Sequence, residues 1–334
     1  MPDSESNRRT NLSSLDLITR TWVADFLGPE LERRQAMSLP RPVLPGTFYM
    51  VTRRCTQQQF LMRPDEATNN NFLYCLGESA KRHGMVLVLS QMMSNHHHTV
   101  VYDRHGHINE FTEHFHKMFA KSQNALRRRW ENLWSSSPVC NVELITVDDV
   151  LEKLVYTATN PVKDGLVDAS HHWPGPQTLP ALMTGKTLTA RRPHHFFRRR
   201  GKMPAEVELT FEFPAELGDP AILKEELARR IQNAEREFTN IRLRENRRVV
   251  GRARVLRQHW TDTPTHREKP DGIRPRIAAR SKWERIAALQ LNKMFVDAYR
   301  RARADWLAGL EAVFPAGTYW LRRFMNVPVA ASTR

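Results

Sequence analysis

Cysteine is scarce in this chain of 334 residues, and long apolar runs are missing. The three cysteines are odd in number and far apart, which argues against a disulfide framework and does not fit a zinc site. No run approaches the ~18 apolar residues of a membrane span. The polar N-terminal residues lack the apolar core of a secretory signal. These absences predict a cytoplasmic protein with no membrane segment.

Internal repeats and phosphate-cradling glycine loops are also missing. The composition is that of a globular protein, with 40% hydrophobic and 26% charged residues, so a core can form. The length is large for one domain and comfortable for two.

The excess of positive over negative charge is confined to the second part of the chain. Residues 1–180 contain 19 of the 51 Lys and Arg and 19 of the 36 Asp and Glu, so the net charge of +15 lies entirely after residue 180. A strongly basic half indicates a polyanionic partner, for which nucleic acid is the first expectation. A membrane surface fits less well, because no basic helix with one strongly apolar face is present there.

Three consecutive histidines lie between the apolar runs 85–89 and 99–102. The β-branched and aromatic residues of these runs predict two strands with a tight Ser-Asn connection. Side chains alternate along a strand, so His96 and His98 should point to one face and His97 to the other. Two imidazoles on one face can chelate a divalent ion. The alternative is a polar strand whose histidines face solvent.

The first half predicts an α+β fold. Strands are expected at 47–54, 85–89, 99–102 and 141–145, and helices at 65–82, 108–130 and 146–160. The order strand–helix–strand–strand–helix–strand is that of the split βαβ (ferredoxin-like) fold, an antiparallel sheet with helices on one face.

Tyr156 and Asn160 are four residues apart in the last of these helices, so they share a face if its last turn holds. Pro161 is expected to end the helix near Asn160. The residues alone leave open two structural roles, a core tyrosine and a helix C-cap.

The second half is expected to be mainly helical. Residues 186–202 contain seven Lys or Arg, no acid and four interleaved His and Phe residues, a composition that suits either phosphate and base binding or a solvated linker. A strand is predicted at 206–213 and helices at 219–238 and 277–310. The arginine-dense residues 241–259 predict either the second helix of a helix-turn-helix reader or an exposed helical pair. A short helix is also predicted at 15–28.

Two motifs carry a family resemblance. Asn95-His96-His97-His98 on a strand, followed about sixty residues later by Tyr156-Thr-Ala-Thr-Asn160-Pro-Val-Lys-Asp-Gly-Leu-Val, resembles the single-tyrosine HUH transposases, and most closely the REP-associated tyrosine transposase branch. The resemblance covers roughly residues 42–180. It departs from the family at His97, where a bulky apolar residue is usual, and in the long segment after residue 180.

The resemblance implies a metal-dependent transposase that nicks and rejoins single-stranded or hairpin DNA through a 5′-phosphotyrosine on Tyr156. It implies that His96, His98 and Asn160 bind Mg²⁺ or Mn²⁺. The implied organisation is an N-terminal segment (1–40) that is disordered or short helical, a catalytic domain (41–180) and a basic DNA-binding extension (181–334). A homodimer is left open. Two other hypotheses are a catalytically silent, sequence-specific DNA-binding protein and an RNA-binding protein on the same sheet.

Overall fold

The computed structural model describes residues 40–265 and 275–332, so the helix predicted at 15–28 lies outside the described residues. Leu44–Leu289 form one compact unit, and the described residues on either side of it belong to a second. The expected boundary at residue 180 falls inside the larger unit. The division into a catalytic domain and a DNA-binding extension stays a prediction.

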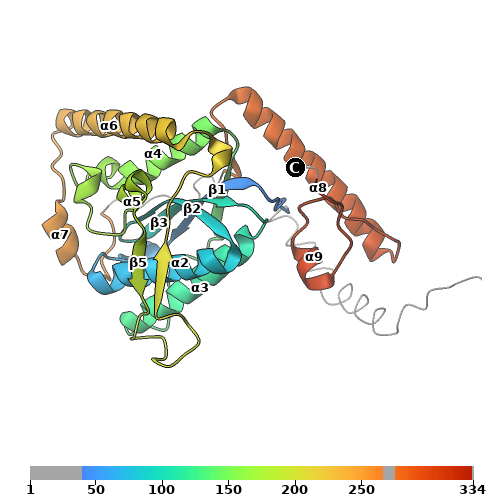
Figure 1. Cartoon of the computed structure of the whole chain (residues 1–334), viewed down its shortest axis with the longest axis horizontal. Coiled ribbons are helices and arrows are strands. Elements are labelled where there is room, and N and C mark those ends of the chain that lie inside the picture. The colour runs from blue at the N-terminus through green and yellow to red at the C-terminus, as the bar shows by residue number, and fades with distance from the viewer. Residues whose placement is uncertain (1–39, 266–274, 333–334) are drawn as a thin grey trace, which may run out of the picture. The chain divides into compact units, whose positions relative to one another are not determined.

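The larger unit is built on a sheet whose strands β1, β2 and β3 are labelled in Figure 1. The sheet has five strands in the order β2-β3-β1-β4-β7. Its strands are β1 (Thr47–Arg54), β2 (Met85–Met92), β3 (His96–Asp103), β4 (Cys140–Leu144) and β7 (Ile277–Ala278). The first four pair antiparallel, and β7 pairs parallel to β4. The predicted α+β fold with a split βαβ sheet is confirmed, and the basic half contributes one additional edge strand.

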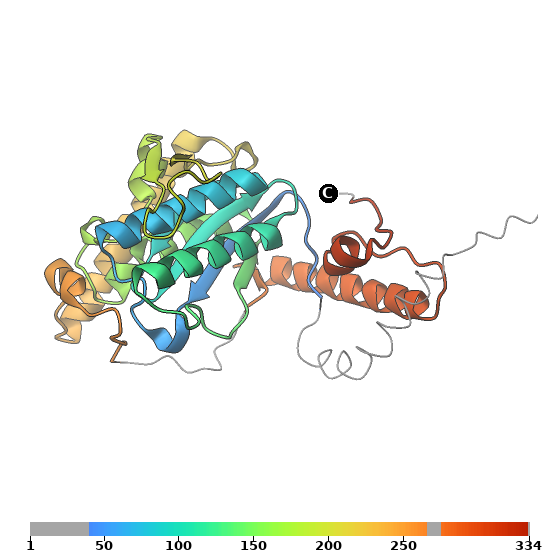
Figure 2. The same ribbon diagram turned by 90° about the horizontal axis from the view of Figure 1, so that it is seen from below.

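Helices α2 (Glu66–His83) and α3 (Ile108–Leu126) cover one face of the sheet (Figure 2). Their phenylalanines at helical spacing are fully buried against each other. Asp65 caps α2 by accepting the amide of Thr68. The predicted end of α3 at residue 130 is wrong. The helix stops at Leu126 because Arg128 adopts a left-handed φ of 53° and the amide of Arg129 bonds back to Asn124.

Helix α4 (Val147–Lys163) contacts β2 and β3 and packs against α6 (Pro220–Arg244). Thr146 and Asp149 form a capping box at its start. The expectation that Pro161 ends this helix near Asn160 is wrong. Pro161 lies inside the last turn, where its missing N–H costs one hydrogen bond, and the amides of Asp164 and Leu166 bond back to the helix end.

The second half contributes several elements to the larger unit. These are α5 (Leu179–Thr184), β5 (Leu188–Arg191), β6 (Glu206–Leu209), α6 and α7 (Arg252–Arg257). The hairpin β5-β6 packs on α2, where Leu209 lies against Gly77. The predicted strand 206–213 is shorter than expected, because beyond Leu209 the backbone leaves its partner and Glu212 donates to the carbonyl of Leu87 instead.

The helical pair predicted around residues 241–259 does not form. Helix α6 continues to Arg244, and the next helix, α7, has only six residues. Val250 and Gly251 donate their amides to the carbonyls of Gly165 and Leu166, so this backbone is bound to the loop after α4 and cannot be helical. Within the described chain, residues 219–259 therefore do not form a helix-turn-helix.

Most of α8 (Lys282–Leu307) and all of α9 (Trp320–Met325) lie in the second unit. The predicted helix at 277–310 is confirmed over this shorter range, because residues 277–278 form β7. Ala302, Trp306, Phe314 and Val327 form a small apolar core of their own. None of the described helices is both long and apolar enough to cross a bilayer.

Candidate active site

Strand β3 places His96 and His98 on the sheet face that α4 covers. Their ring centres are 4.8 Å apart. His97 points to the opposite face, as alternation predicts, and packs against Phe72 and Phe115. There its Nε2 lies 2.9 Å from Nε2 of His116. The polar residue at this position therefore has a buried polar partner on α3.

Helix α4 brings Tyr156 and Asn160 to the two histidines. The ring of Tyr156 meets that of His98 edge-on, with ring centres 5.2 Å apart. One turn further on, the side-chain nitrogen of Asn160 lies 3.4 Å from Nε2 of His98. The strand and the helix are 62 residues apart in the sequence at this contact. The tertiary fold thus gathers all four residues that the two motifs single out.

Two neighbours hold the imidazoles in place: Asn95, the first residue of the histidine motif, and Thr52, which the sequence did not indicate. The carbonyl oxygen of the Asn95 side chain accepts from Nδ1 of His96 at 2.7 Å. Thr52 Oγ1 lies 2.8 Å from Nδ1 of His98, because these residues are opposite each other in the β1–β3 register. The amide nitrogen of Asn160 can only donate, so Nε2 of His98 accepts and its Nδ1–H donates to Thr52. Both rings therefore direct an unprotonated Nε2 away from their Nδ1 partners.

The site keeps its imidazoles neutral. Burial, reinforced by the charge of Arg54, lowers the pKa of His96 to about 4. Burial and the neighbouring His96 hold the pKa of His98 well below its usual range. A charged imidazole needs solvation, and burial has removed the water without supplying a replacement. Near pH 7 both rings therefore stay unprotonated at Nε2, the form in which an imidazole can bind a cation.

The donor set of the site fits a divalent ion. Oδ1 of Asn160 is buried and has no hydrogen-bond partner among the described residues, the situation in which a cation would satisfy it. No group of three or more His, Cys, Asp or Glu side chains suited to a metal occurs in the described part of the chain. A third protein ligand beside His96 and His98 would therefore be the Asn160 amide. Two imidazoles and one amide oxygen suit Mn²⁺ better than Mg²⁺.

A further cation lies beside the tyrosine. Nζ of Lys163 is 4.9 Å from the centre of the Tyr156 ring, and its charge also acts on His98. Lys163 reaches this position because α4 continues past Pro161, which puts it two turns after Tyr156 on the same face. The sequence shows that Lys163 follows Tyr156 by seven residues. Because the helix is expected to end near Asn160, however, the sequence does not predict that the two share a helix face.

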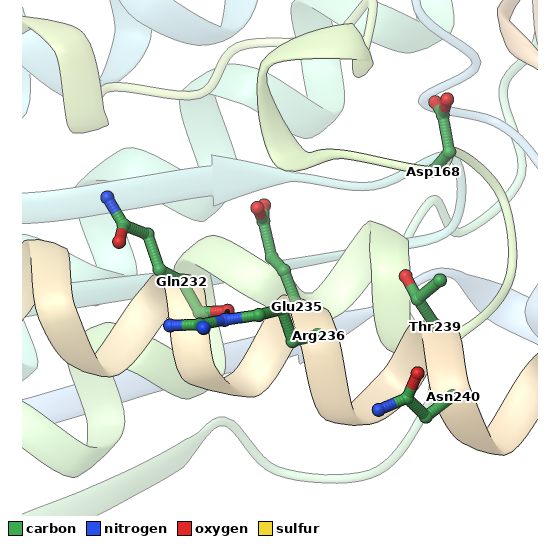
Figure 3. A pocket seen from close by; sticks show the side chains of 6 residues that line it. All are labelled: Asp168, Gln232, Glu235, Arg236, Thr239 and Asn240. Carbon is green, nitrogen blue, oxygen red and sulfur yellow. Dashed lines mark hydrogen bonds between the residues drawn. The ribbon is translucent and has the colours of Figure 1, made fainter.

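A surface cavity of about 460 Å³ lies elsewhere, along α6 and the loop that carries Asp168 (Figure 3). Its charged groups are already engaged within the protein. Glu235 accepts the amide of Ser170, Asp168 pairs with His172, and the Arg236 guanidinium turns back to its own helix. None of the residues singled out by the two motifs lines it.

Comparison with known proteins adds little to this geometry. No protein-family model matches the chain, and no curated protein matches it. A solved structure described as a REP-associated tyrosine transposase bound to a REP hairpin is similar over 51% of this chain and 96% of its own, with 15% identity and a TM-score of 0.38. Similarity at that level supports no conclusion about the family or the chemistry of this chain. Any argument about its chemistry must come from its own residues.

Proposed function

We propose that this protein is a DNA strand transferase that nicks and rejoins single-stranded or hairpin DNA, with Tyr156 as its nucleophile. The observation that carries the proposal is the contact of the Tyr156 ring with His98, beside Asn160, at the meeting of two motifs that are remote in sequence. A core tyrosine would have no need of two neutral imidazoles and a buried, unpaired amide oxygen beside it.

In the proposed reaction, the phenolic Oη of Tyr156 loses its proton and forms a bond to the phosphorus of a phosphodiester. The bond from phosphorus to the 3′ oxygen breaks, and that oxygen takes up a proton. The product strand carries a 5′-phosphotyrosine and a free 3′-hydroxyl. Because the phosphoester bond is exchanged and not hydrolysed, the reverse attack by a 3′-hydroxyl rejoins DNA without an added energy source.

Free tyrosine has a pKa near ~10 and is a weak nucleophile at neutral pH. Lys163 places a positive charge beside the ring where phenolate and phosphate charges would meet. His96, His98 and Asn160 would hold the divalent ion, which when bound neutralises charge on a nonbridging phosphate oxygen. Thr52 and Asn95 keep the two imidazoles turned with Nε2 toward that position.

The test is covalent capture. The full chain is incubated with Mn²⁺ and a pool of 3′-labelled single strands that carry a hairpin and randomised flanks. Label that stays with the denatured protein is the expected result, and peptide mapping should place it on Tyr156. Tyr156→Phe should still bind DNA but form no adduct. Tyr102→Phe, which removes a hydroxyl whose partner is Glu216, serves as the matched control and should react normally.

Other outcomes separate the alternatives. DNA binding without an adduct in the wild type would support the catalytically silent DNA-binding protein. Nicking that survives in Tyr156→Phe would mean that water and not tyrosine is the nucleophile. A preference for RNA with no nicking would support the RNA-binding hypothesis.

A further inference from the structure

A strap of residues 247–262 crosses the end of the larger unit beside the candidate site, and it includes α7. It contains five arginines and a single acid, Asp262. The side chains of Arg248, Arg254 and Arg257 are exposed, and within the described part of the chain they form no ion pair. Asp262 is engaged by the amide of His259. The strap therefore presents nearly uncompensated positive charge.

The strap is attached along its whole length. At its start, Gly251 donates to the carbonyl of Leu166 at 2.9 Å. In its middle, the Arg63 side chain donates to the carbonyl of Leu256. At its end, Phe60 donates to the carbonyl of Asp262 at 2.8 Å. Such a segment is a fixed surface and not a flexible tail.

A buried side chain of the strap packs against residues next to both the strand and the helix of the site. Val255 is fully buried in a cluster with Met93 and Val162. The amide of Met93 bonds to the carbonyl of His96, and Val162 follows Asn160 by two residues. The strap is thus one layer of side chains away from the strand and the helix that build the site.

The far end of the strap adds aromatic surface. Trp260 stacks with the guanidinium of Arg129, which lies 5.8 Å from its ring centre. Arg129 belongs to the loop after α3, and the next residue, Trp130, is 91% exposed. The same loop runs beside β1, where the amide of Ser135 donates to the carbonyl of Arg54 opposite His96. The arginines of the strap are therefore continued by the Trp260 and Trp130 rings at its far end.

We propose that the strap and the Arg129–Trp130 corner form a binding surface for single-stranded DNA, which holds the unpaired strand next to the site. Arginines bind successive phosphates, and indole faces stack on bases. An unpaired strand fits better than a duplex, because the bases of a duplex are already stacked and leave Trp130 without a partner. The proposal rests on the proposed function for its account of why the strand is held there, but binding can be measured without it.

The test uses the full chain with Tyr156→Phe as background, so that no cleavage occurs. Arg254→Ser with Arg257→Ser is compared with Arg198→Ser and Arg200→Ser, exposed arginines in the β5–β6 loop, which packs against α2 and α3 through Phe197 and His195. Both pairs remove the same charge. Binding of a fluorescent single strand is measured over a series of salt concentrations.

The strap pair should weaken binding and reduce the slope of log K against log salt by about 1.4, since each phosphate contact to a single strand contributes about 0.7. The loop pair should leave both nearly unchanged. Trp130→Ala should weaken single-strand binding about five- to a hundredfold and affect duplex binding little. Unchanged melting temperatures show that the variants are folded.

Equal loss in the two arginine pairs would overturn the proposal, because it would show only general charge attraction. Tighter binding of a duplex, or indifference to Trp130→Ala, would overturn it as well. If the wild type forms no covalent adduct but the strap variants lose single-strand affinity, the binding surface stands and the transferase function fails. If the wild type nicks DNA and the strap variants bind with normal affinity, the transferase function stands and the binding surface fails.

Discussion

Thr52 of β1 and His98 of β3 face each other across the strand pair, with the threonine hydroxyl 2.8 Å from Nδ1 of the imidazole. This contact sets which ring nitrogen is left for a cation. Hydrogen-bond partners of this kind orient metal-binding histidines and tune their affinity.

We therefore predict that Thr52→Val lowers Mn²⁺ affinity about 10- to 100-fold, because Nδ1 of His98 loses its partner while the shape of the side chain is kept. Thr52→Ser keeps the hydroxyl and should retain most of the affinity. Isothermal titration with Mn²⁺ measures both. Equal affinity in the valine and serine variants would show that His98 is oriented by something else.

Lys163 should matter for rate more than for binding. Lys163→Gln removes the charge beside Tyr156, and adduct formation at saturating DNA should slow about tenfold, less than for a buried oxyanion donor because Lys163 is exposed to water. Lys163→Arg should recover much of the rate. A variant that changes only the DNA concentration needed for half-maximal rate would make Lys163 a binding residue.

The buried pair His97 and His116 should tie stability to pH. His116→Leu leaves Nε2 of His97 unpaired and should lower the free energy of unfolding by about 1–3 kcal/mol. The double change to leucine removes both polar groups and should recover part of that loss. Urea unfolding of the two variants beside the wild type measures the coupling.

The pH effect has a definite sign. Burial, with smaller effects of His96 and Arg53, lowers the pKa of His97 to about 3. Below about pH 6.5 the unfolded imidazole gains a proton while the folded one does not, so the contribution to stability is lost as pH falls from about 6.5 toward 3. The double leucine variant should lose less stability over that range. Parallel pH curves for the two proteins would contradict this assignment.

The basic half should prove necessary for folding. A chain cut after residue 180 loses Leu209, Leu227 and Val255, all buried in the larger unit, and should be insoluble or molten. A chain cut after residue 281 keeps these residues and should fold cooperatively, because little of α8 before residue 290 is buried. Circular dichroism melts compare the two. A soluble, cooperatively folding chain of residues 1–180 would show that the two halves are independent.

Periodicity alone was enough to predict much of this protein. Alternation along a strand placed His96 and His98 on one face of that strand. The helical repeat placed Tyr156 and Asn160 on one face of their helix. The element order identified the split βαβ sheet. These features depend on backbone geometry within a few residues, and the order of polar and apolar residues in a short segment is enough to predict such geometry.

Only the tertiary structure decided what lies next to what. The packing of α4 on β3 placed Tyr156 against His98, and strand register placed Thr52 there. The extension of α4 past Pro161, which brings Lys163 to the site, depends on amides from the following loop. The arginine-dense segment looked helical by itself, but long-range backbone bonds to Gly165 and Leu166 made it a strap. Contacts between residues far apart in the chain depend on how whole surfaces fit together, and no local pattern records that.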